Sequence, residues 1–434
     1  MTTTLIPEQG FLRDWTDLYT PKGEAPMEAH LGTALAVASA TIGWRGWISW
    51  GELSEPLTMM VVLEGRSAVA RKTTTASAAW KVASMATDGQ EAAGLVVRNM
   101  AHTSDRGVYE AIGTTDDVLA KAWERTPPPG HLWVWDEIGA LFGRPDDVKG
   151  GDWLGRIRAA LMTLTAGRHG GIQTGTTRIA PSRCAVTLLG TMTRAELEAR
   201  MSLMLVQDGF LGRMVLIPIG PRRTYLSRPP AWTQEDLDRR DRLVAWVRSI
   251  AGSQDCWGEA FMHHDKAALA LRDTWYQERS KQFDHEAEGG DEVAVARATA
   301  FARLQATAVK MASIAALAEK DPDEPIAQVK VHERHVQWGI MLAEHTLKEL
   351  ASLVREGQGV TADRYARKVI DYIASVGESN RKKLLDRVRM DGMSRDARWR
   401  VVEGLAQDGS VEIEVQQTGG RPAFVVRAPA SVAA

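Results

Sequence analysis

The chain has 434 residues, of which 44% are hydrophobic and 25% charged, a composition typical of globular proteins. Its 53 Lys and Arg residues nearly balance 55 Asp and Glu residues, which excludes a uniformly basic protein of the histone kind. Cys184 and Cys256 lie far apart, so we expect neither a disulfide scaffold nor a thiolate zinc site. The first residues show no secretory signal and no apolar stretch has the length of a membrane span, so we expect a cytoplasmic protein without membrane contact.

This length suits two or three domains, and the residue pattern divides the chain into four segments. Residues 1–57 combine a short arm with a helical stretch, and residues 58–230 alternate apolar strands with helices. Residues 231–358 have a helical pattern throughout most of their length. Residues 359–434 show three short helices followed by a β-hairpin, which predicts a winged-helix module; a generic small α+β tail is the alternative. The alternation in the second segment predicts an α/β fold with a mainly parallel sheet covered on both faces.

The first apolar run, TMMVVLEG at residues 58–65, predicts a strand that ends in Gly65. The segment EGRSAVARKTTT then leads into a helix of small residues, with Lys72 and Thr73 where the Lys-Thr pair of a P-loop belongs. In a P-loop, backbone N–H groups and the Lys hold the phosphates, and the Ser or Thr binds Mg²⁺. The usual G-x-x-x-x-G-K-[ST] pattern is not met, because Arg71 replaces the second Gly, so an ordinary basic strand-to-helix turn stays open. The candidate cofactor-binding residues are Gly65, Ser67, Arg71, Lys72, Thr73 and Thr74.

A second apolar strand ends in two carboxylates. HLWVWDE at residues 131–137 predicts a buried strand followed by Asp136 and Glu137. A strand-end Asp can hold Mg²⁺, and a neighbouring Glu can orient or deprotonate the attacking water. Because the two motifs share one α/β segment in the expected order, we predict an ATP and Mg²⁺ site with metal ligands Thr73 and Asp136 and with Glu137 as a catalytic residue.

Two later strands supply further candidates. The apolar strand at residues 184–193 ends near Thr191 and Thr193, where a polar side chain can contact the γ-phosphate or the water; strand-capping threonines are the alternative. In DGFLGRMVLI, residues 208–217, Arg213 follows a glycine turn at the start of a core strand. Such an Arg can act in trans on a neighbouring subunit's nucleotide by stabilising the transferred charge; a plain ion-paired surface Arg is the alternative.

These motifs together resemble the primase-helicase-associated P-loop ATPase family of phages and other mobile elements, a helicase-like domain family of unknown function. The resemblance covers roughly residues 25–345 and depends on the order of its segments, which are APMEAHLGTALAVASATIG, MMVVLEGRSAVARKTTT, HTSDRGVYEAI, HLWVWDEIGALF, AVTLLGTMTRAEL, DGFLGRMVLI and a helical lid at ATAFARLQATAVKMASIAAL. It implies a P-loop NTPase core of the RecA or AAA+ kind that forms a ring, with Arg213 as the finger. The order of the strands, which separates these two arrangements, is left open by the sequence.

The tail is the basic part of the chain. Residues 361–434 carry 13 Lys and Arg residues against 10 Asp and Glu residues, a net charge of +3 in a chain whose net charge is -2. A recognition helix can enter the major groove of DNA while flanking cations hold phosphates; a module that contacts protein is the alternative. The candidate DNA-binding residues here are Arg381, Lys382, Lys383, Arg395, Arg398, Arg400 and Arg421.

A Gly-rich segment at residues 169–183 predicts a hairpin. Arg168 and Arg178 at this hairpin are candidates for gripping DNA phosphates in a ring's central pore, and a subunit-contact hairpin is the alternative. The ten histidines show no spacing typical of metal ligands, so we expect no transition-metal site. We expect five of them on helix surfaces, namely His263, His264, His332, His335 and His345.

The leading hypothesis from the sequence is an ATP-dependent DNA motor. It would be a ring-forming, hexameric helicase or replication initiator of a phage or mobile element that uses ATP and Mg²⁺. The first alternative is a non-hydrolysing, nucleotide-switched DNA-binding regulator. A second alternative is the ATPase subunit of a defence complex, which a partner protein would stimulate more than DNA does.

Overall fold

The fold is built around a five-stranded sheet in which all strands are parallel. The strand order is β4 (Leu95–Met100), β5 (Gly130–Trp135), β8 (Ala185–Met192), β3 (Met60–Glu64) and β9 (Met214–Pro218). This confirms the mixed α/β fold and the parallel sheet that the alternating pattern predicts. The computed structural model describes residues 6–50, 53–65, 72–86, 95–100, 108, 130–142, 151–167, 172–173, 178–179, 185–200, 209–221, 226, 228, 230–251, 260–289, 292–321, 323–389, 393, 395–417 and 422–429.

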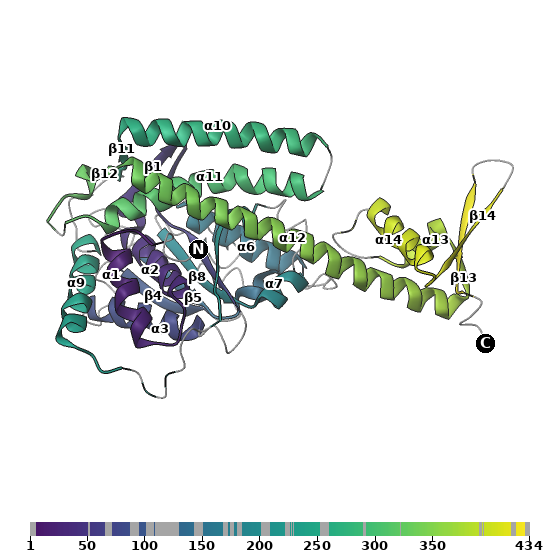
Figure 1. Ribbon diagram of the computed structural model, residues 1–434, viewed down its shortest axis with the longest axis horizontal. Coiled ribbons are helices and arrows are strands. Elements are labelled where there is room, and N and C mark those ends of the chain that lie inside the picture. The colour runs from purple at the N-terminus through teal and green to yellow at the C-terminus, as the bar shows by residue number, and fades with distance from the viewer. Residues whose placement is uncertain are drawn as a thin grey trace.

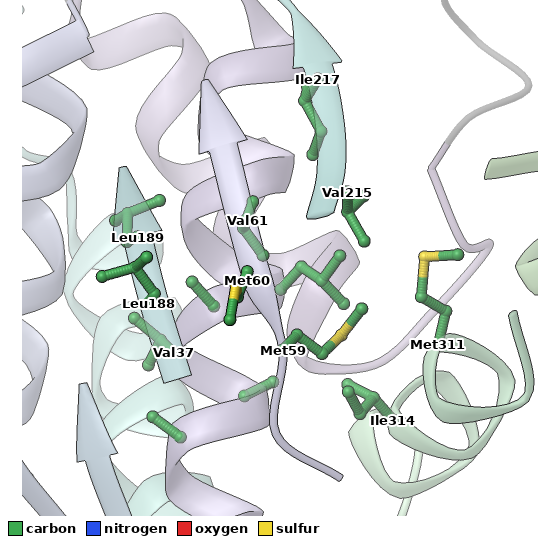
Figure 2. Close-up of a cluster of buried hydrophobic side chains, with 14 of the residues drawn as sticks. Val37, Met59, Met60, Val61, Leu188, Leu189, Val215, Ile217, Met311 and Ile314 are labelled. Atoms are coloured by element: carbon green, nitrogen blue, oxygen red, sulfur yellow. The ribbon is translucent and has the colours of Figure 1, made fainter. Parts of the chain in front are cut away.

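The central strands are buried on both faces. Every residue of β3, β5 and β8 is buried, and Val61 of β3 lies in register with Leu189 of β8 and Val215 of β9. Figure 2 shows these side chains in one cluster with Val37 of a covering helix. A parallel sheet covered on both sides needs such continuous apolar runs, which is why these strands were recognisable in the sequence.

Helix α2 (Met27–Ile42) covers one face of the sheet and lies deep in the core, with 14 of its 16 residues buried. The helix comes so close to the sheet that a Cβ at Gly130 of β5 would lie 1.7 Å from the carbonyl oxygen of Ala40. Only glycine permits this approach, because any side chain would collide with backbone. Three further helices pack on the same side of the sheet, namely α1 (Phe11–Tyr19), α3 (Lys72–Ala86) and α9 (Gln234–Ala251).

The opposite face carries a different set of elements. The η4 turn (Ile138–Phe142) and α6 (Gly151–Thr165) pack on β8, and α7 (Arg194–Arg200) packs on η4 and on α12 (Glu333–Val376). Gly190 of β8 lets Ile138 pack directly on the strand, since a Cβ there would lie 2.7 Å from that side chain.

Several short elements join distant parts of the chain. A small sheet pairs β1 (Gly46–Trp50) with β2 (Leu53–Pro56) and with β10 (Ala260–Phe261), which lies more than 200 residues away in sequence. The hairpin predicted at residues 169–183 is represented by β6 (Ile172–Gln173) paired antiparallel with β7 (Arg178–Ile179). The remaining short elements are η2 (Thr20–Lys22), η3 (Gly43–Arg45), η5 (Leu211–Arg213), η6 (Ile326–Gln328), β11 (His263–His264) and β12 (Lys330–Val331).

Long helices lie beside the sheet and lead away from it. α10 (Lys266–Glu288) and α11 (Glu292–Ala318) pack against each other and against α12, which has 44 residues and is about 66 Å long. Leu342 and Leu353 of α12 belong to the main core, whereas Tyr365 and Ile373 of the same helix belong to a second core. The division expected at residue 358 therefore falls inside one continuous helix, which Figure 1 shows extending from the main body to the C-terminal elements.

The second core holds together what we call the C-terminal module, residues 362–429. It contains the end of α12, α13 (Arg381–Arg387), α14 (Arg395–Gln407) and an antiparallel sheet of β13 (Glu378–Asn380), β15 (Ala423–Arg427) and β14 (Glu412–Gln416). Its largest buried side chains include Tyr365 and Trp399. Among the residues that the structure describes, no helix of the chain is both long and apolar enough to span a membrane.

Candidate functional site

The connections of the parallel sheet single out one place on its edge. The chain leaves β3 through α3 and goes to β4 at one border of the sheet, whereas it leaves β8 through α7 and goes to β9 at the other border. α3 packs with α2 and α9 on one face, and α7 packs with α12 on the other. Neighbouring parallel strands whose connections leave on opposite faces create a crevice at their carboxyl ends, the usual ligand position in open α/β sheets.

Three of the predicted site residues meet at this edge. The Thr191 hydroxyl, at the end of β8, donates a hydrogen bond of 2.5 Å to Oδ1 of Asp136, which follows β5. The same hydroxyl oxygen accepts a hydrogen bond of 3.4 Å from the backbone N–H of Glu137. Thr191 is buried, whereas both acidic residues are exposed. The hydroxyl therefore fixes the turn that presents the two carboxylates to solvent.

Glu137 has an unusual backbone conformation. Its φ is +55°, and it is the only non-glycine residue with positive φ among those the structure describes. The left-handed region costs an L-residue about 1 kcal/mol, so the surrounding structure must hold it there. Such strained residues cluster at functional sites because strain persists only where other contacts over-determine it.

The candidate phosphate-binding segment begins at the neighbouring strand. Gly65 follows β3 and donates its N–H to the Met192 carbonyl at 3.0 Å, which ties the end of β3 to the end of β8. α3 begins at Lys72, so Lys72 and Thr73 occupy its first turn, and Thr74 is exposed on the same helix. Ser67 and Arg71 lie outside the described residues, as do the side chains of Lys72 and Thr73.

The two candidate threonines of β8 have different environments. Thr193 accepts the backbone N–H of Glu196 at its hydroxyl, at 3.2 Å, and so caps the first turn of α7. Thr191 instead contacts the carboxylate of Asp136. The structure thus assigns Thr193 to helix capping and leaves Thr191 as the residue directed at the acidic pair.

Arg194 at the start of α7 is a residue that the sequence analysis missed. Its guanidinium bridges the end of β3, where Glu64 is buried, to the helix α12. Its partners are Glu64 at 3.4 Å, Glu198 at 2.8 Å, Glu349 at 3.0 Å, Ser352 at 3.2 Å and Glu356 at 2.7 Å. The i,i+4 spacing of Arg194 and Glu198 is visible in the sequence, but nothing local shows that α12 lies opposite.

Arg213 lies at the other edge of the sheet. It directly precedes β9, whose five residues separate it by about 17 Å from the carboxyl edge. Its Nη1 donates to the Gly209 carbonyl at 2.8 Å, and the side chain borders a cavity of about 110 Å³ together with Arg303 and Lys310. Within one chain, Arg213 and the Asp136–Glu137 pair therefore belong to different sites.

The candidate DNA-binding residues fall into two groups. The Arg381 guanidinium lies over the Trp399 ring, 4.5 Å from its centre, and Arg398 donates to the Leu385 carbonyl at 2.7 Å. These two residues hold the C-terminal module together. The side chains of four others point to solvent, namely Lys382, Lys383, Arg395 and Arg400. Arg168 and Arg421 lie outside the described residues, as does the side chain of Arg178.

The expectation that the histidines lie on helix surfaces is wrong for three of them. His263 and His264 form strand β11, and His335 is buried at the start of α12. His335 Nδ1 accepts the backbone N–H of His332 at 3.0 Å, and its Nε2 lies 3.2 Å from Glu319. Since both ring nitrogens face protein groups, His335 acts as part of the helix cap.

Within the described residues, no cluster of three or more His, Cys, Asp or Glu side chains is placed to hold a metal ion. The carboxyl edge nevertheless offers Asp136 and Glu137, whose hard oxygen atoms suit Mg²⁺ bound together with phosphates. No protein-family model matches the chain, and no curated protein matches it in sequence.

Proposed function

We propose that the protein is a Mg²⁺-dependent ATPase that acts as a ring-forming DNA motor of the helicase or replication-initiator type. The observation that carries the proposal is the meeting of Thr191, Asp136 and the strained Glu137 at the crevice of the parallel sheet. The helix that starts with Lys72 and Thr73 follows the neighbouring strand β3. The order of the sheet, with β8 between β3 and β5, leaves about 10 Å between the strands that carry the two motifs.

Each residue has a distinct role in this proposal. Lys72 and the first backbone N–H groups of α3 bind the phosphates, which the positive end of the helix dipole also favours. Thr73 and Asp136 hold Mg²⁺, which supplies charge neutralisation on the transferred phosphoryl group. Glu137 orients or deprotonates the attacking water, and Thr191 positions Asp136 and the Glu137 backbone.

The position of Arg213 supports a shared site between subunits. An Arg at the amino edge of the sheet is too far from its own chain's acidic pair, so its contribution to hydrolysis would come in trans, across a subunit boundary. This is the arrangement that a ring requires, with each nucleotide held between two copies. The proposed motor is therefore a homo-oligomer, and DNA is its substrate.

The decisive experiment measures ATP turnover by the full chain with and without single-stranded DNA. We expect Lys72→Ala to abolish turnover and Glu137→Gln to lower kcat by about 100-fold or more while ATP binding persists. Glu278→Gln, an exposed substitution on α10, is the matched control and should turn over ATP at the parent rate. A Lys72→Ala protein that hydrolyses ATP at the parent rate would defeat the proposal. ATP binding without any turnover by the parent chain would favour a nucleotide-switched regulator instead.

A further inference from the structure

The cations of the C-terminal module gather on α13 and the residues directly after it. Residues 382–389 contain four exposed cations and one exposed carboxylate, with a net charge of +3. They are Lys382, Lys383, Asp386, Arg387 and Arg389. The side chains of Lys382, Lys383 and Arg387 form no ion pair or hydrogen bond with any residue that the structure describes. Leu384 and Leu385, which alternate with them, are buried in the second core, so all three cations lie on the outer face of the helix.

The next helix, α14, has a different surface. Its exposed residues are Arg395, Asp396, Arg400, Glu403, Gly404 and Gln407, and their net charge is zero. Arg398, the third Arg of this helix, points inward and donates to the carbonyl groups of Leu385 and Val388. Of the two exposed Arg residues of α14, Arg395 lies next to Asp396 at the start of the helix, and Arg400 lies four residues after Asp396 and three before Glu403.

The sheet of the module is acidic on its outer face. Glu378, Glu412 and Glu414 lie there with Arg427, which pairs with Glu378 at 2.8 Å and with Glu414 at 2.7 Å. The net charge of these four residues is -2. A polyanion that approaches the described part of the module is therefore attracted at α13 and repelled at β13 and β14.

Duplex DNA fits the α13 face better than a membrane does. Lys382 to Arg387 span about 7.5 Å of helix, and one strand of a duplex presents a phosphate about every 3.4 Å along its axis. Flexible Lys side chains over that distance suit phosphate contacts that carry no sequence information. Stable attachment to an anionic membrane surface takes an apolar anchor besides the cations, whereas the apolar residues of α13 are buried.

We infer that the exposed face of α13, with Lys382, Lys383 and Arg387, is the primary DNA contact of the module and binds the phosphates of double-stranded DNA without sequence preference. The third helix, α14, does not read bases in this arrangement. The inference deepens the proposed function, since it names the surface and the kind of DNA on which the motor would be loaded.

The test is a salt titration of DNA binding by the full chain, measured by fluorescence anisotropy with short duplexes of two unrelated sequences. We expect K382Q/K383Q/R387Q to weaken binding at least about 10-fold and to lower the slope of log affinity against log salt by about 3, equally for both duplexes. The matched control K266Q/K281Q/K330Q removes three exposed cations elsewhere and should change affinity less than about 2-fold. R400Q should also change it less than about 2-fold.

Three results would overturn the inference. They are a parent chain that binds neither duplex at low salt, a triple α13 variant that binds like the parent, and an R400Q variant that loses as much affinity as the triple variant. Thermal unfolding of each variant shows whether a loss of binding comes from a loss of folding. ATP turnover of the parent chain without DNA is measured separately, so a failure of the ATPase proposal and a failure of the α13 surface give different results.

Discussion

Arg194 and Lys310 of the main core and the lysines of α13 in the C-terminal module use their charge in opposite ways. In the core, Arg194 contacts four carboxylates, and the buried Lys310 pairs with Glu55 at 2.8 Å. In the module, Lys382 and Lys383 extend into solvent without a partner among the described residues. Arg194 and Lys310 therefore fix the relative positions of structural elements, while the lysines on α13 remain available for a ligand.

The two regions also differ in their histidines. The core encloses His30 on α2 and His131 on β5, both nearly inaccessible to solvent. The histidines of this chain all lie before residue 346, so the module has none. Mild acid should therefore destabilise the core before it affects the C-terminal module.

The largest expected effect is acid destabilisation of the core. Burial lowers the pKa of His30 to about 4, and burial together with the charge of Arg98 lowers the pKa of His131 to about 4. Between pH 6.5 and pH 4 the unfolded chain binds more protons than the folded chain, so stability is full above pH 6.5 and falls as the pH drops toward 4. Each histidine contributes about 3 kcal/mol to this loss.

Urea unfolding at a series of pH values measures this effect. His30→Gln and His131→Gln should each flatten the dependence of the free energy of unfolding on pH in that window. His285→Gln, at a side chain that is 88% exposed, is the control and should leave the curve unchanged. A parent protein as stable at pH 4.5 as at pH 7 would contradict the assignment.

A smaller loss is expected when the Arg194 network is broken. Arg194→Ala would leave Glu64 buried without this cation and would leave several carboxylates close together, which we expect to cost about 2 kcal/mol. Arg194→Lys keeps the charge without the planar fork and should recover part of the loss. The free energy of unfolding of the two variants provides the comparison, and an Arg194→Ala protein as stable as the parent would show that the network adds nothing.

The parts of the fold that were predictable from sequence share a physical cause. Strands β3, β5 and β8 are continuous apolar runs because helices cover both faces of the sheet. The proximity of Thr191 and Asp136 was also predictable, because the carboxyl ends of parallel strands lie at the same edge of a sheet. The hydrogen bond between Thr191 and Asp136 and the positive φ of Glu137 depend on tertiary packing, so the local sequence does not predict them.

Other features depend on partners that lie far apart in the chain. Strand β1 pairs with β10, with Gly46 opposite Ala260, and no local sequence pattern predicts this pairing. The sequence also did not predict that α12 continues through Gly357 and Gly359. Two glycines destabilise a helix by about 2 kcal/mol, and a pair of them is typical of a linker between domains. Packing at both ends of α12, in two separate cores, offsets that cost.

Removing Arg398 should have an intermediate effect. Its guanidinium donates to two carbonyl groups at the end of α13, so Arg398→Ala should destabilise the module by about 1 kcal/mol. In a helix, residues seven apart lie on the same face, and Leu405 lies seven residues after Arg398 and is buried. This spacing could have predicted that the Arg398 side chain points inward. Amide hydrogen exchange of residues 381–407 in the full chain checks the prediction, with Arg400→Ala as the control expected to stay within about 0.5 kcal/mol of the parent.

The smallest expected effect concerns the partner-free cations. Lys383→Ala and Lys382→Ala should each change the free energy of unfolding by less than about 0.5 kcal/mol, because neither side chain forms an interaction with the described residues that the substitution would remove. A small gain in stability is the expected sign, since each change relieves repulsion among neighbouring cations on α13. Added salt should reduce that gain by screening the same repulsion. A loss of more than about 1 kcal/mol in urea unfolding would mean that these lysines stabilise the module. Lys382 and Lys383 would then have a structural role like that of Arg194 and Lys310, and the contrast between the two regions would fail.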